Sequence, residues 1–172
     1  MNKKVLVLGV GAQGSAAAKK LDEEPGVSEI VCADYDINAV NIIVKGMKKA
    51  KGVQVDAHDV NSIIAAGKGA DLVINALPLE CTENVLDATL AIKADYQDYA
   101  GTISLDQMWI DSEFYDPASE PGFEDPAAIK WWRSLNAMYK IYGPKFEKIG
   151  KLAIFGTGSA PGLICAATRE SM

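Results

Sequence analysis

Three glycines near the N-terminus are spaced as in a loop that binds phosphates. The segment Gly9-Val10-Gly11-Ala12-Gln13-Gly14 has the pattern G-x-G-x-x-G. The first glycine of this pattern permits a tight turn, the second lets a pyrophosphate approach the backbone, and the third lets a helix pack closely on a sheet. The helix that follows offers free N–H groups and a partial positive charge. We therefore expect residues 9–14 to bind the pyrophosphate of a dinucleotide.

An acidic residue stands where such a loop needs a partner for the adjoining ribose. Asp34 lies about 20 residues after Gly14, at the end of an apolar stretch. Its carboxylate can accept hydrogen bonds from both ribose hydroxyls and would repel the 2′-phosphate of NADP. No Lys or Arg is present among the next residues, 35–38. We predict NAD as the cofactor, with NADP disfavoured; the alternative is a glycine-rich turn that binds no ligand.

Two later stretches fit the same ligand. Asp59 and Val60 follow a short apolar segment and are placed near the adenine, although Asp59 can equally be a helix N-cap. The second stretch ends an apolar run and contains Asn75, Ala76, Leu77 and Pro78. Ligands of open α/β sheets bind at the carboxyl ends of the strands. We therefore expect its backbone to pass under the nicotinamide ribose.

Strand and helix patterns alternate through the first hundred residues, which must position these groups. Short apolar runs predict strands at residues 5–8, 29–33, 53–55, 71–76 and 96–99. Helices are predicted at residues 13–24, 37–51, 60–66 and 82–94, with Gly52 ending the second and Thr82 as N-cap of the last. Lys48, Lys49 and Lys51 then lie at a helix end, where cations suit the dipole. The pattern predicts an α/β fold: a doubly wound, mostly parallel Rossmann sheet with helices on both faces.

The alternation stops near residue 101. We divide the chain into a Rossmann core at 1–107, a helical and loop insertion at 108–150, and a sixth strand with the start of a helix at 151–172. Within the insertion, an acidic loop is predicted at 111–126 and a helix at 127–142, ended by Gly143 and Pro144. Adjacent Trp131 and Trp132 point to different sides of that helix, so one is expected in the core and one at the surface, marking a domain or dimer contact. The ending at 151–172 predicts that a substrate and dimerisation domain follows; the alternative is that the last helix caps the sheet and the domain stands alone.

Composition narrows the class of protein. The 172 residues are 49% hydrophobic and carry a net charge of −6, which argues against a nucleic-acid binder. No apolar run approaches the roughly 20 residues that span a bilayer. Three widely spaced cysteines argue against a disulfide framework and against a zinc or other metal site. We expect a cytoplasmic protein without a membrane segment.

Two motifs together resemble a known family. The loop at residues 9–14, paired with the late segment Gly156-Thr157-Gly158-Ser159-Ala160-Pro161-Gly162-Leu163, is similar to the saccharopine dehydrogenase-like reductases, which include lysine 6-dehydrogenases. The stretch from Ala76 to Asp98 resembles the same family. The resemblance implies a two-domain NAD(P)-dependent enzyme that oxidises or reduces a C–N bond of an amino acid or polyamine and forms a homodimer when full length. Cys165 departs from the family, which often has asparagine there.

Candidate catalytic residues lie at the carboxyl ends of the later strands. Asp98 is a candidate to hold a substrate ammonium and Tyr99 to donate a proton. Cys81 opens a helix, whose N-terminus would lower the pKa of its thiol; packing or capping is the alternative role. We predict that the backbone around Ser159, Pro161 and Gly162 meets the substrate carboxylate or the nicotinamide. The only histidine, His58, is assigned a surface or structural role near the adenine.

Three hypotheses follow from these residues. The first is the NAD(P)-dependent dehydrogenase or reductase, acting on a small amino-acid or amine substrate and represented by its cofactor-binding portion. The second is a non-catalytic NAD-binding regulatory module. The third is another Rossmann dehydrogenase, such as a semialdehyde dehydrogenase with Cys81 or Cys165 as nucleophile.

Overall fold

The chain folds around a six-stranded parallel sheet. A computed structural model describes residues 2–103 and 106–158, and its strands run in the order β3-β2-β1-β4-β5-β6. Every pair of neighbouring strands is parallel. This order reverses between β1 and β4, as in the doubly wound dinucleotide-binding folds, so the predicted fold class is confirmed. The strands are β1 (Lys3–Leu8), β2 (Val27–Asp34), β3 (Ala50–Gln54), β4 (Leu72–Asn75), β5 (Asp95–Asp98) and β6 (Ala153–Ile154).

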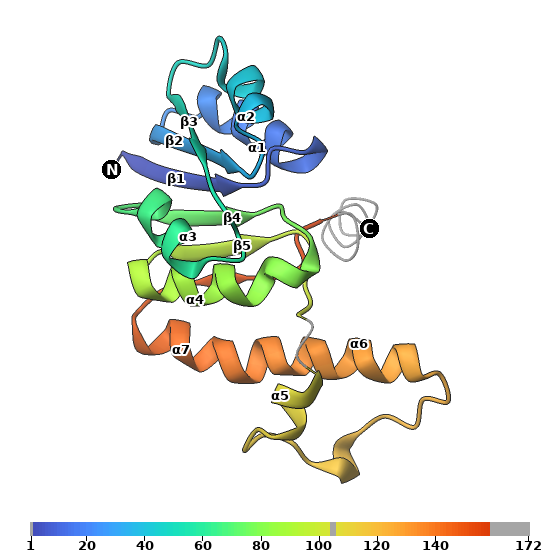
Figure 1. Cartoon of the computed structure of the whole chain (residues 1–172). Helices are drawn as coiled ribbons and strands as arrows, with labels where there is room; N and C mark the ends of the chain where they lie inside the picture. The colour runs from blue at the N-terminus through green and yellow to red at the C-terminus, as the bar shows by residue number, and fades with distance from the viewer. Residues whose placement is uncertain (1, 104–105, 159–172) are drawn as a thin grey trace, which may run out of the picture.

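Helices cover both faces of this sheet (Figure 1). They are α1 (Ala12–Glu23), α2 (Ile37–Val44), α3 (Val60–Gly67), α4 (Thr82–Ile92), α5 (Asp106–Ile110), α6 (Pro126–Ala137) and α7 (Gly143–Lys148). Shorter turns lie at Leu79–Cys81 and Pro117–Ser119, and a π-helical segment joins α6 to α7 at Met138–Tyr142.

Alternate residues of β1 face two separate cores. Val5 and Val7 pack with residues of α1 and α2, including Ala18 and Val40. Leu6 and Leu8 belong to a larger core that includes residues of α3, α4 and α7 on the opposite face. Because strand side chains alternate between faces, an uninterrupted apolar strand requires cover on both sides. This requirement explains the apolar run that predicted the first strand.

The predicted helix at 37–51 is too long. Helix α2 ends at Val44, Gly46 takes a positive φ of 88°, and β3 begins at Ala50. Gly52 therefore lies inside a strand, where a Cβ would come within 2.6 Å of Val40 Cγ1. The glycine lets α2 pack closely on β3; it does not end a helix.

The three lysines near this point do not serve a helix dipole. Lys51 lies in β3 and its Nζ is 2.6 Å from Glu29 Oε1. The backbone N–H groups of Lys48 and Lys49 donate to the carboxylate of Asp22, which holds the turn before β3. The interpretation of these cations as helix-end charges is wrong because the helix stops before them.

The helical segment after residue 126 continues past the predicted end. Gly143 and Pro144 do not end a helix; they form the first turn of α7, where the missing N–H of a proline is tolerated. The π-helical segment Met138–Tyr142 connects α6 to α7, so that the two run on along one line in Figure 1. Thr82 is likewise the first residue of α4 and not its N-cap, a position that Cys81 occupies without a capping side chain.

Trp131 and Trp132 divide as predicted. Trp131 is 55% exposed, whereas Trp132 packs against the larger core and meets Trp109 edge to face. Whether the exposed ring marks a domain or dimer contact stays a prediction, as do the domain boundaries at 107 and 150.

Candidate functional site

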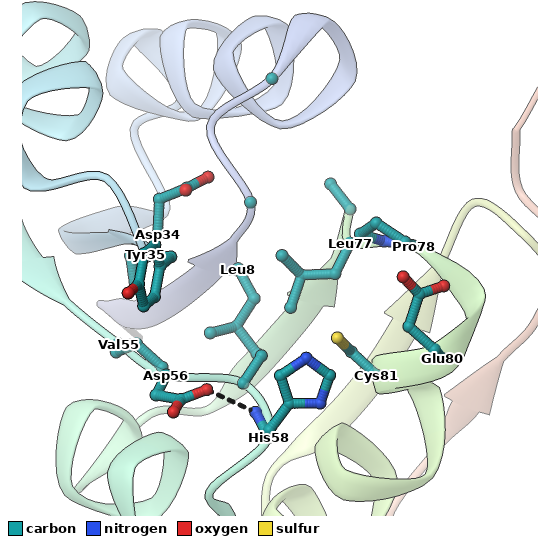
Figure 2. A pocket seen from close by; sticks show the side chains of 15 residues that line it. Leu8, Asp34, Tyr35, Val55, Asp56, His58, Leu77, Pro78, Glu80 and Cys81 are labelled. Atoms are coloured by element: carbon teal, nitrogen blue, oxygen red, sulfur yellow. Dashed lines mark hydrogen bonds between the residues drawn. The ribbon is translucent and has the colours of Figure 1, made fainter.

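A cavity of about 590 Å³ opens at the carboxyl ends of β1, β2 and β4. Figure 2 shows its side chains converging from these strands and from the segments after β3 and β4. Its lining consists of Leu8, Gly9, Gly11, Ala33, Asp34, Tyr35, Val55, Asp56, Ala57, His58, Ala76, Leu77, Pro78, Glu80 and Cys81. This is the edge at the switch point of the strand order, where open α/β sheets bind their ligands.

The glycine loop forms one wall through backbone packing. Gly9 has a φ of 87°, and a Cβ there would lie 2.8 Å from the carbonyl oxygen of Ala76. A Cβ on Gly14 would overlap the carbonyl oxygen of Gly9, so only glycine lets α1 start this close to the loop. A Cβ on Gly11 would meet nothing within 4 Å, and Gly11 itself lines the cavity. The loop thus leaves room for a ligand where a pyrophosphate needs it.

Helix α1 begins directly beside this opening. Ala12 and Gln13 form its first turn, and Gly11 precedes it without a capping side chain. The first N–H groups of a helix have no partner within the helix and favour an anion. Ala12, Gln13 and Gly14 are not themselves lining residues, so their contribution is the orientation of this helix end.

Asp34 connects β2 to the glycine loop. Its Oδ2 accepts a hydrogen bond of 2.8 Å from the N–H of Val10, and its Oδ1 accepts one of 3.2 Å from the N–H of Asp36. Each carboxylate oxygen keeps a further lone pair for a ribose hydroxyl. The carboxylate is therefore held in place by the loop and still faces the cavity (Figure 2).

Residues 55–58, which directly follow β3, line the side of the cavity where the sequence predicts the adenine. The N–H of His58 donates to Asp56 Oδ1 at 2.9 Å, and its ring points into the cavity in Figure 2. Asp59 instead caps α3 by accepting from the N–H of Asn61, and Val60 is the first residue of that helix. Neither lines the cavity. Asp56 is a lining residue that the sequence motifs did not single out, although its place just beyond a strand's carboxyl end was a usable signal.

The lining is acidic. Asp34, Asp56 and Glu80 contribute three carboxylates, and no Lys or Arg is among the described residues that line the cavity. Three carboxylates without a lining cation repel a further negative group.

Cys81 is buried at the cavity wall, 6% exposed. Burial raises the pKa of its thiol, and the nearby carboxylates of Glu80, Asp56 and Glu83 raise it further. The expectation that this pKa is lowered is wrong, because burial and the nearby negative charge raise it. A thiol nucleophile at this position would need the opposite shift.

Asp98 and Tyr99 lie away from this cavity. Asp98 is 1% exposed and accepts hydrogen bonds on both carboxylate oxygens, from Tyr96 on one and from Gly101 and Gly156 on the other. Tyr99 is half-buried, packs against the core beside α1 and α2, and burial raises the pKa of its phenol.

Asn75 is buried behind the cavity, whereas Ala76, Leu77 and Pro78 line it. Ser159, Pro161, Gly162 and Cys165 lie outside the described residues.

Residues 2–103 and 106–158 carry neither a metal-binding cluster nor a membrane span. Within these ranges no three His, Cys, Asp or Glu side chains are grouped as a metal site would need. Nor does any helix there have the length and apolar character to cross a bilayer.

Comparison with known proteins agrees with this geometry. Residues 5–129 match the family model described as saccharopine dehydrogenase NADP binding domain. A carboxynorspermidine synthase of Vibrio alginolyticus is 27% identical over an alignment of 174 positions. The alignment covers 93% of this chain and 37% of that protein. The chain thus spans little more than a third of the length of this relative.

Solved structures share the fold. The apo saccharopine dehydrogenase (L-Glu forming) of Saccharomyces cerevisiae superimposes with a TM-score of 0.65 at 18% identity, covering 99% of this chain and 31% of that one. GenD2 from gentamicin A biosynthesis, in complex with NAD, gives a TM-score of 0.60 at 14% identity and covers 91% of this chain and 35% of that one.

Proposed function

Because this chain belongs to the saccharopine dehydrogenase NADP-binding-domain family, we propose that it is the cofactor-binding portion of an NAD-dependent oxidoreductase that acts on a C–N bond of an amino acid or polyamine. The observation that carries the proposal is the cavity in which Gly11 leaves open space beside the start of α1 and the N–H of Val10 in the same loop holds the carboxylate of Asp34. These residues fit a dinucleotide, because Gly11 adds no side chain to the cavity that it lines and the held carboxylate of Asp34 lines the same cavity. The carboxynorspermidine synthase relative and the saccharopine dehydrogenase neighbour support the amino-acid or polyamine substrate class.

In this proposal the bound nicotinamide supplies the hydride transfer, and the chain binds and orients it. The loop at residues 9–14 and the start of α1 bind the pyrophosphate. Asp34 accepts from the adenosine ribose, and residues 55–58 surround the adenine. Ala76, Leu77 and Pro78 pass under the nicotinamide ribose. A substrate pocket, a dimer contact and a cytoplasmic location stay predictions for the whole protein.

The choice of NAD over NADP rests on charge. The family model carries NADP in its description, but the cavity of this chain presents three carboxylates and, among its described lining residues, no Lys or Arg. A 2′-phosphate beside Asp34 would bring two like charges into contact, which disfavours binding. We therefore propose NAD as the preferred cofactor.

Calorimetric titration of the chain with NAD and with NADP tests this choice. We expect NAD to bind at least about tenfold more tightly, a difference of about 1.4 kcal/mol. Asp34→Asn keeps the size of the side chain, removes its charge and gives up one of its two backbone hydrogen bonds, so it should weaken NAD binding and reduce the preference for NAD over NADP. Asp36→Asn is the matched control, because asparagine caps a helix as well as aspartate and Asp36 does not line the cavity. NADP binding equal to or tighter than NAD binding by the unaltered chain would refute the NAD preference.

A further inference from the structure

A buried network of three polar side chains lies behind the cavity, at the carboxyl ends of β4 and β5. Asn75 Nδ2 donates to the Tyr96 hydroxyl at 3.1 Å, and that hydroxyl donates to Asp98 Oδ2 at 3.0 Å. The three residues are at most 3% exposed. Buried polar groups that hydrogen-bond to one another hold their surroundings in a single arrangement, because leaving one of them unpaired raises the free energy of the folded state.

One end of this network fixes part of the cavity wall. Asn75 Oδ1 accepts a hydrogen bond of 3.1 Å from the N–H of Leu77. That contact closes the turn at residues 76–78, and the Ala76 carbonyl oxygen in it lies against Gly9. Leu77 and Pro78 line the cavity and Asn75 does not. Asn75 can therefore act on a ligand only through the backbone that it holds.

The other end fixes the turn after β6. Asp98 Oδ1 accepts from the N–H groups of Gly101 at 3.0 Å and Gly156 at 2.7 Å. The Asp98 carbonyl oxygen also accepts from the hydroxyl of Thr157 at 2.7 Å. Burial raises the pKa of Asp98, whereas the three donors to its carboxylate oppose that shift by stabilising the charged form. The loss of any one donor would leave a buried carboxylate under-satisfied.

The strand order places this network at one half of the proposed ligand. A dinucleotide spans the switch point between β1 and β4, with one mononucleotide on each half of the sheet. Asp34 on β2 marks the adenosine half. The turn at residues 76–78 follows β4, on the half that receives the nicotinamide nucleotide.

We propose that Asn75, Tyr96 and Asp98 are positioning residues for the nicotinamide half of the dinucleotide, acting through the backbone of residues 76–78. The inference rests on the proposed function, because it assumes a dinucleotide in the cavity. It assigns Asp98 a role in holding the cofactor wall, distinct from contact with a substrate ammonium.

Two ligands separate positioning from general stability. ADP carries the adenosine and pyrophosphate but no nicotinamide nucleotide, whereas NAD carries both. Tyr96→Phe keeps the ring that packs on Phe146 and Phe155 and deletes the hydroxyl that joins Asn75 to Asp98. Calorimetric titration of the full 172-residue variant should show NAD affinity lowered by about tenfold and ADP affinity changed by less than about twofold.

Tyr142→Phe is the matched control. Tyr142 is also a buried tyrosine of the same core, and its hydroxyl lies near Asp87, outside this network. It should alter the melting temperature without altering the ratio of NAD to ADP affinity. Asp98→Asn is a second test variant, because it keeps an oxygen for Gly101 and Gly156 while presenting an amide donor to Tyr96.

The outcomes are distinct. A selective loss of NAD affinity in Tyr96→Phe or Asp98→Asn, absent from Tyr142→Phe, supports the inference. Equal losses for NAD and ADP, or no loss for NAD, would overturn it while leaving the proposed function intact. Failure of the unaltered chain to bind either ligand would overturn the proposed function, and the inference with it.

Discussion

The glycine-loop region and the aromatic region of this chain are held together by different kinds of contact. The glycine-loop region, β1 to β2, relies on contacts to the main chain: Gly14 packs on the carbonyl of Gly9, and the N–H of Val10 donates to the carboxylate of Asp34. The aromatic region, β5 to β6 with α5–α7, relies on rings such as Trp109 against Trp132 and Tyr96 against Phe146. The glycine-loop region depends on positions without a side chain, and the aromatic region depends on large side chains.

The difference shows what each region tolerates. Close backbone packing cannot accommodate an added methyl group, because the carbonyl oxygen that the methyl meets cannot change rotamer to make room. Aromatic packing depends on buried area, so its energy is spread over many contacts. We expect a small added group in the glycine-loop region to cause a large loss of unfolding free energy. In the aromatic region we expect the loss to grow with the buried area that is removed.

The largest effect is expected from Gly14→Ala. Its Cβ would overlap the Gly9 carbonyl oxygen, so α1 or the loop must move. We expect a loss of about 4 kcal/mol in unfolding free energy, measured by urea denaturation, with NAD binding abolished. Gly11→Ala is the control, because nothing lies within 4 Å of its Cβ. Gly11→Ala should change the unfolding free energy by less than about 1 kcal/mol. It should still lower NAD affinity about tenfold, because the added methyl group occupies space that the ligand needs. Similar stability in the two variants would contradict the importance of backbone packing at Gly14.

Most of the glycine-loop region could be predicted from the sequence because its contacts are encoded by spacing. The loop, Asp34 and the apolar β1 lie within one short unit, and each residue type has one geometric use there. The end of α2 could not be predicted in the same way. Gly52 signals a helix stop locally, whereas its use is to admit Val40 from a helix packed across the strand.

Trp109→Ala should give the largest effect in the aromatic region. Trp109 is 2% exposed and packs edge to face with Tyr115 and Trp132. Removing it should lower the unfolding free energy by about 3 kcal/mol in urea. Trp131→Ala, at the exposed neighbour of Trp132, should change it by less than about 0.5 kcal/mol. NAD affinity should be unchanged in both variants under conditions where they stay folded. A loss of NAD affinity in Trp109→Ala comparable to that of Gly11→Ala would show that ring packing between α5 and α6 also shapes the cavity, and would contradict this expectation.

The site was less predictable than the fold, for a physical reason. The network of Asn75, Tyr96 and Asp98 joins β4 to β5 and then reaches Gly156, 58 residues beyond Asp98. No local pattern marks such a contact, and the place of Asp98 at a strand end points by itself to a substrate role. Cys81 shows the same limit: its helix position and the neighbouring Glu80 and Glu83 were readable, but the burial and the Asp56 carboxylate that also raise its pKa come from the tertiary structure.

The smallest effect is expected from a partly exposed ion pair that holds the loop of the aromatic region. Glu120 accepts from Arg133 Nε at 2.6 Å and Nη2 at 3.0 Å, and this pairing lowers the pKa of Glu120 below its ordinary 4.5. A carboxylate with a lowered folded-state pKa stabilises the fold above its unfolded-state pKa. This contribution is lost as the pH falls through the folded-state value.

Glu120→Gln should therefore lower the melting temperature by about 2 °C at neutral pH, and the difference from the unaltered chain should vanish below the lowered pKa. Glu124→Gln is the control, because Glu124 is exposed and has no hydrogen bond or ion pair within the described residues. Melting curves recorded across the acid range measure both variants. High salt should shrink the effect at Glu120, since solvent reaches the pair. A difference in melting temperature that persisted at low pH would contradict this prediction. It would show that the packing of the Glu120 side chain, and not its ion pair with Arg133, holds the loop against α6.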